Sequence, residues 1–145
     1  EIQIPEIEVP SSGATFMGAA LELLAQEVET NVKKTTSDEK GDWRPLIFLM
    51  TDGAPSDVYA YQQIIPHIQQ LNFATIVACA AGPKAKTETL LQLTQKVVVL
   101  DTMDTTSFSS FFKWVSASVV AGSSSAGISG PISLPPPPSE IQLVL

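Results

Sequence analysis

Apolar residues follow two different spacings along the chain, and the two spacings alternate. Four segments have the three- and four-residue spacing of an amphipathic helix, at about residues 17–32, 57–71, 87–95 and 106–122. Three short runs between them, 46–50, 74–80 and 97–100, are continuously apolar, which is typical of strands covered on both faces. The alternation predicts an α/β fold, a partial doubly wound, Rossmann-like arrangement with a mainly parallel sheet flanked by helices.

Three details of the helices follow from the same pattern. Pro66 lies inside the second helical segment, where we expect a kink or a break. Gly122 is the expected end of the last helix. The buried face of that last helix is predicted from its spacing to consist of Phe108, Phe111, Phe112, Val115 and Val119.

The two ends of the chain differ from the middle. Residues 1–9 alternate apolar and polar, but Pro5 restricts them to an edge strand or a loop. After Gly122 the composition turns to Ser, Gly and Pro, so we expect a domain at 1–122 and a Ser/Gly/Pro-rich tail at 123–145. We interpret its proline run as a linker; recruitment of a partner, or pairing of residues 141–145 with a sheet edge, are the alternatives.

Composition removes several classes of function. With a formal net charge of -7, the chain lacks the basic character expected of a nucleic-acid or anionic-membrane binder. A single cysteine, Cys79, excludes an internal disulfide or a CxxC site. No apolar run reaches the roughly 18 residues that a membrane span needs, and no signal segment begins the chain, so we expect a cytoplasmic protein.

Oxygen-bearing side chains gather where the predicted parallel strands end. Thr51, Asp52 and Gly53 follow the first strand, Asp101 and Asp104 follow the third, and the loop 11–15 precedes a helix that starts at the same edge. Such hard oxygen donors suit Mg²⁺ or Mn²⁺.

Each of these residues also has a structural alternative. Asp52 is either a metal ligand or a carboxylate that caps the turn, and Thr15 is either a ligand or a helix N-cap. Asp57 is expected to be the N-cap of the second helix. Asp101 and Asp104 are expected to be solvated loop acids, and Cys79 a small core residue.

Two sequence motifs resemble those of a known family. Residues 49–57, LMTDGAPSD, resemble the apolar strand and TDGxPxD turn of von Willebrand factor A (VWA) domains, and residues 12–21, SGATFMGAAL, resemble their threonine loop and following helix. Residues 41–45, GDWRP, and 111–116, FFKWVS, resemble the tellurium-resistance, TerY-like branch of that family. The resemblance covers about residues 11–122.

This resemblance implies a metal-ion-dependent adhesion site, built in the family from a DxSxS motif, a threonine and an aspartate. Thr15 and Asp52 match the threonine and the aspartate, but the chain contains no DxSxS. The chain therefore resembles the C-terminal part of a VWA domain. We expect the complete domain to bind Mg²⁺ or Mn²⁺, and this chain alone to bind it weakly or not at all, because three family ligands are absent.

The resemblance implies a non-enzymatic adaptor in bacterial tellurite or chemical-stress signalling. Its protein partner, such as a kinase or phosphatase of the same pathway, would offer a carboxylate to the metal. The alternatives are a truncated VWA remnant without metal, or a flavodoxin-like or phosphotransfer enzyme that uses Asp52. The family's first strand would lie beside residues 46–50, so its absence predicts an open, aggregation-prone sheet edge.

Overall fold

The computed structural model describes residues 6, 8, 11–71, 73–102, 104–124, 134–139 and 141–144. Its sheet has four strands in the order β1 (Leu46–Thr51), β2 (Thr75–Ala81), β3 (Val97–Leu100) and β4 (Gln142–Val144). The β1–β2 and β2–β3 pairs are parallel, and β4 runs antiparallel to β3. The predicted α/β class with a mainly parallel sheet is therefore confirmed.

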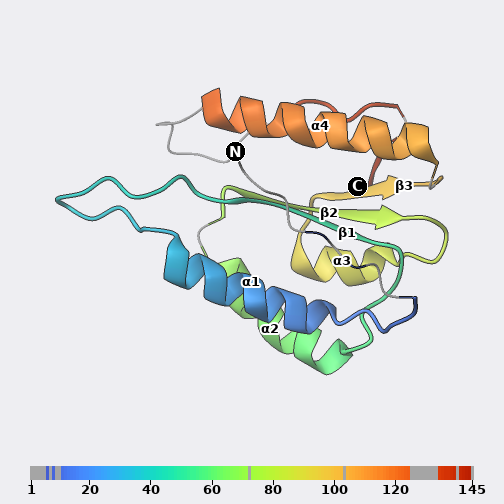
Figure 1. Ribbon diagram of the computed structural model, residues 1–145, viewed down its shortest axis with the longest axis horizontal. Helices are drawn as coiled ribbons and strands as arrows, with labels where there is room; N and C mark the ends of the chain where they lie inside the picture. Colours follow the sequence, from blue (N-terminus) through green and yellow to red (C-terminus); the bar gives the residue numbers. More distant parts are fainter. Residues whose placement is uncertain are drawn as a thin grey trace.

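Helices cover both faces of this sheet (Figure 1). α1 (Met17–Asn31), α2 (Val58–Gln70) and α3 (Thr87–Leu93) lie on one face, and α4 (Thr105–Ser124) lies on the other. No helix among the described residues is long and apolar enough to cross a membrane. Pro66 lies within the thirteen residues of α2 and does not break the helix, so the expected break is wrong, while the alternative of a kink stays a prediction.

The alternation of side chains along β2 divides the core into two layers. Ala78 and Ala80 belong to the cluster that packs against α1, α2 and α3. Cys79, between them, faces the opposite cluster with α4, where it is fully buried as a small core residue. Burial raises the pKa of its thiol to about 12, so this cysteine stays protonated.

The buried face of α4 agrees with the predicted one at Phe111 and Val115 but differs from it elsewhere. Phe112 and Val119 are 58% and 45% exposed, whereas Trp114 is buried and its ring meets Phe48 of β1 edge-on, with 6.2 Å between centroids. The larger indole ring takes the central place against the sheet and turns the 112 and 119 positions outward. α4 also continues to Ser124, so its expected end at Gly122 is wrong.

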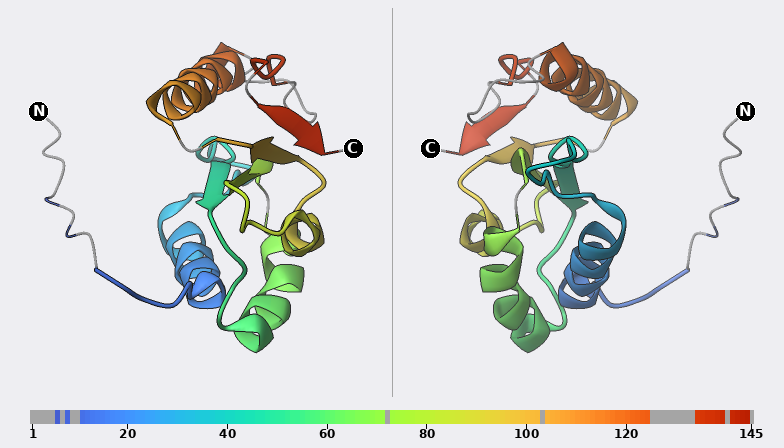
Figure 2. Two further views of the ribbon diagram at one scale, coloured as in Figure 1. Left: turned by 90° about the vertical axis from the view of Figure 1, so that its right-hand side faces the viewer. Right: turned by 90° about the vertical axis from the view of Figure 1, so that its left-hand side faces the viewer.

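The C-terminal residues that the structure describes pack on the domain, as Figure 2 shows for β4 beside β3. The indole N–H of Trp114 donates to the carbonyl oxygen of Pro135 at 2.9 Å, and Ile141 is buried in the α4-side cluster. The linker interpretation is therefore wrong for residues 134–139, while the alternative of sheet pairing is confirmed for Gln142–Val144. The apolar contacts of Ile141 and Leu134 compensate for the entropy lost in ordering the segment.

The expected extended segment 1–9 lies outside the described residues, except for Glu6 and Glu8, which are exposed.

Candidate metal-binding edge

The turn after β1 and the loop before α1 meet at the carboxyl edge of the sheet, at the right-hand end of Figure 1. Two hydrogen bonds join them. The backbone N–H of Ser56 donates to the carbonyl oxygen of Thr15 at 2.8 Å, and the Thr15 N–H donates to Oγ of Ser56 at 3.0 Å. The structure thus brings Thr15 to the segment 52–57 that carries Asp52. Ser56 was not predicted to belong to the site, although a hydroxyl four residues after Asp52 is a signal that the sequence carries.

Asp57 strengthens the same junction. Its two carboxylate oxygens accept the backbone N–H groups of Gly18 at 3.1 Å and Ala19 at 2.9 Å, at the start of α1. Asp57 occupies the N-cap position of α2 but makes no side-chain cap there. The prediction that Asp57 is the N-cap residue of the second helix is therefore confirmed for its position. Its carboxylate does not cap that helix but binds the free N–H groups of the neighbouring helix α1, which lie within its reach.

The ionisation of Asp57 reflects these bonds. Desolvation raises the pKa of its carboxyl group, but hydrogen bonds from the backbone N–H groups of Ala19 and Gly18 outweigh that effect, and the net pKa lies below 3.8. The carboxylate is therefore the form that holds the first turn of α1 against the start of α2.

Close packing of α1 on α2 fixes the junction further. A Cβ added at Gly18 would lie 2.4 Å from the backbone nitrogen of Tyr61 and 2.7 Å from the carbonyl carbon of Ala60. Only glycine allows the two helices to approach this closely. The two loops of the candidate site consequently lead into two helices, α1 and α2, that are packed closely together.

Thr51 shapes the turn that carries Asp52. Its hydroxyl donates to the carbonyl oxygen of Gly53 at 3.0 Å and accepts the Gly53 N–H at 3.3 Å. The alternative role considered for Asp52, capping the turn with its carboxylate, is thus performed by Thr51. Asp52 itself is exposed, and no described residue is hydrogen-bonded to its carboxylate.

Thr15 is not a helix N-cap. The N-cap residue of α1 is Phe16, which makes no side-chain cap bond, and the Thr15 hydroxyl caps nothing among the described residues. Its backbone is held at both ends, since the Met17 N–H also donates to its carbonyl oxygen at 3.0 Å. Thr15 is therefore a half-buried residue whose backbone is held on both sides.

The other acids of this edge, Asp101 and Asp104, are exposed, as expected of solvated loop acids, but each also has a structural partner. Asp104 accepts the Ser107 N–H at 2.7 Å at the start of α4, and this bond, followed by the hydroxyls of Thr102 and Ser107, lowers the pKa of its carboxyl group. Asp101 accepts a hydrogen bond from Nε2 of Gln142 in β4 at 2.9 Å. Both side chains are exposed, but they hold α4 and the C-terminal strand.

The donor set fits a hard divalent cation only in part. Asp52 supplies a carboxylate and Thr15 a hydroxyl, both of which are oxygen donors that Mg²⁺ accepts. No group of three or more His, Cys, Asp or Glu side chains among the described residues could hold a metal ion. About four of the roughly six positions around Mg²⁺ would be left to water or to ligands from outside these residues.

We compared the chain with protein-family models, with curated proteins and with solved structures, and none of them matches it.

Proposed function

We propose that this protein is a non-enzymatic, metal-dependent protein-interaction module of the VWA type, acting as an adaptor in bacterial tellurite or chemical-stress signalling. The observation that carries the proposal is the pairing of Thr15 with Ser56, which joins the threonine loop to the TDG turn. The physiological context comes only from the resemblance of the sequence motifs to the TerY-like branch.

In this proposal Asp52 and Thr15 would hold Mg²⁺ or Mn²⁺ together with water and with ligands from outside the described residues. The metal would supply a positive charge that attracts a carboxylate, such as one on a kinase or phosphatase of the same pathway. Asp52 suits the role because it is exposed and makes no hydrogen bond to a described residue, so binding a cation breaks no contact.

The remaining polar groups of the edge act as supports rather than ligands. Asp57 is committed to the N–H groups of Gly18 and Ala19, and Asp104 is committed to Ser107. Thr51 holds the turn through Gly53. The site therefore contains one carboxylate ligand, Asp52, and its affinity for a metal depends on the further ligands that a partner supplies.

Calorimetric titration of Mg²⁺ into the chain tests the proposal. We expect weak binding, with a dissociation constant on the order of 1 mM or weaker, because most of the coordination shell remains water. Asp52→Asn removes the one carboxylate ligand of the proposed site and should abolish the heat of Mg²⁺ binding. Asp101→Asn is the matched control, since it removes a nearby charge without removing a proposed ligand. Tight binding, or weak binding that Asp52→Asn leaves unchanged, would contradict the proposal.

A further inference from the structure

The outer edge of β1 is open in the part of the chain that the structure describes. β1 pairs with β2 on one side, and no described strand lies on the other. The opposite end of the sheet is β4, which has only three residues, and a very short edge strand is one of the ways by which sheets avoid further pairing. β1, with six residues, is not shortened in this way.

The backbone directions along β1 identify the groups that point outward. The carbonyl oxygen of Pro45 accepts the N–H of Ala74 at 2.9 Å, so it points toward β2. Because these directions alternate along a strand, the N–H and C=O groups of Leu46, Phe48 and Met50 point away from β2. Three outward donors and three outward acceptors therefore line this edge without a charged residue or a proline among them.

The charges at the two ends of β1 have opposite sign and equal spacing from its centre. Arg44 precedes the strand by two residues, and Asp52 follows it directly. Phe48 lies midway between them. An antiparallel copy of the same segment, centred on Phe48, would place each Arg44 opposite the Asp52 of the other copy.

We propose that two copies of this protein associate through their β1 strands, antiparallel, about a two-fold axis at Phe48. In this register the outward groups of Leu46 face those of Met50 on the second copy, and the Phe48 residues face each other. All three residues of one copy find backbone partners on the other, giving about six hydrogen bonds. A parallel arrangement offers no opposite charges at the ends and does not close with two-fold symmetry.

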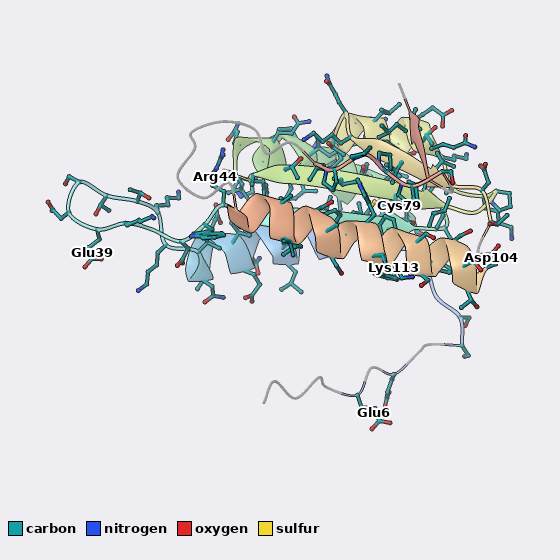
Figure 3. All side chains as sticks on the ribbon, turned by 90° about the horizontal axis from the view of Figure 1, so that it is seen from above. Glu6, Glu39, Arg44, Cys79, Asp104 and Lys113 are labelled. Atoms are coloured by element: carbon teal, nitrogen blue, oxygen red, sulfur yellow. The ribbon has the colours of Figure 1, made fainter. Side chains whose placement is uncertain are left out.

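The side chains near the axis are compatible with this pairing. Phe48 and Met50 both pack against the α4-side cluster, so they lie on the same face of the sheet. In the pair, the two Phe48 rings become cross-strand neighbours, a combination that stabilises antiparallel sheets. Figure 3 shows Arg44 toward the end of the molecule that carries the Glu39 loop, and Asp104, which follows β3, at the other end.

The association closes at two copies. The pair forms one continuous sheet whose remaining edges are the short β4 strands. Two six-residue strands bury less surface than a standard stable interface, so the dimer is weak and depends on concentration. The inference requires no metal, but it shares Asp52 with the proposed function, because this carboxylate would either pair with Arg44 of the second copy or bind a cation.

Sedimentation analysis of the full chain in EDTA tests the inference without interference from metal. We expect a monomer–dimer equilibrium. Arg44→Glu and Asp52→Arg should each weaken dimerisation about tenfold, since each places like charges opposite each other. The double variant Arg44→Glu/Asp52→Arg restores opposite charges and should recover dimerisation, which a damaged fold would not do. Lys40→Glu, an equal change of charge on the neighbouring loop, is the control and should have no effect.

Cysteine cross-linking tests the register. In oxidising conditions, a mixture of Leu46→Cys and Met50→Cys chains should form a disulfide-linked pair, whereas Leu46→Cys alone should not, because two 46 positions lie far apart. The native Cys79 is fully buried and does not interfere. A chain that remains monomeric at millimolar concentration, a dimer that ignores the charge reversals, or efficient cross-linking of Leu46→Cys with itself would overturn the inference.

Discussion

At the residue scale, the candidate metal-binding edge depends on side chains whose work is to hold two loops together. Ser56 joins the turn after β1 to the loop before α1, Asp57 binds the first turn of α1, and Gly18 allows the two helices to touch. Sequence spacing placed Asp57 correctly at the N-cap position of α2 but did not predict that its carboxylate would bind the start of α1. Propensity rules assign a cap to the helix that follows it, and they contain no information about a neighbouring helix that begins nearby in space.

Gly18→Ala tests the close contact of α1 and α2. The added methyl group would meet backbone atoms of Tyr61 and Ala60, which cannot move without shifting the helix. We expect a loss of about 1–3 kcal/mol in the free energy of unfolding, measured by urea denaturation. Gly13→Ala is the matched control, because an added Cβ there meets nothing within 4 Å. Equal stability of the Gly18→Ala variant and the wild type would show that the contact is not tight.

The lowered pKa of Asp57 predicts how the stability depends on pH. The folded state favours the carboxylate more than the unfolded chain does, so this contribution is complete above the ordinary value of 3.8 and is lost as the pH falls through the lower pKa of the folded state. Asp57→Asn should therefore be less stable than the wild type near neutral pH, with the difference shrinking in acid. Thermal melts from pH 7 to pH 2 measure it. The exposed loop residue Asp38 supplies a control, Asp38→Asn, and a Tm difference for Asp57→Asn that does not depend on pH would contradict the account.

At the element scale, apolar spacing predicted the helices and the three parallel strands. It did not predict which face α4 buries, or that the described residues of the tail pack on the domain. The spacing of Phe108, Phe112 and Val119 describes a good apolar face, yet the helix buries Trp114 against Phe48 instead. The burial of Trp114 depends on the tail, because the carbonyl oxygen of Pro135 accepts the indole N–H and Ile141 belongs to the same apolar cluster. A pattern read within one helix cannot include a partner about twenty residues away.

Trp114→Phe tests the link between α4 and the tail. The variant keeps an aromatic ring but loses the hydrogen bond to Pro135, so we expect a loss of about 0.5–1.5 kcal/mol in the free energy of unfolding. Hydrogen exchange should accelerate at Gln142–Val144, where β4 pairs with β3. Phe112→Leu, on the exposed side of α4, is the control and should change stability by less than about 0.5 kcal/mol. Unchanged exchange in β4 would show that the tail is held independently of Trp114.

At the scale of the whole molecule, the alternation of helices and strands was sufficient for the α/β class and the parallel pairing of β1, β2 and β3. It placed the carboxyl edge correctly because all parallel strands end on the same side. The antiparallel strand β4 could only be raised as an alternative, since three residues after a proline run carry little pattern. The chemistry of the edge is less determined than its position, because a single exposed carboxylate needs further ligands to hold a metal.

The most direct test of the central claim, that Thr15 and Asp52 form one face of a metal site, is nuclear magnetic resonance of the labelled chain with Mn²⁺. Paramagnetic broadening depends on distance and detects even weak binding. We predict that the amide signals of residues 13–16 and 52–54 broaden first, and that Asp52→Asn removes this effect while Asp101→Asn preserves it. Broadening centred elsewhere, or broadening at the edge that persists in Asp52→Asn, would contradict the account.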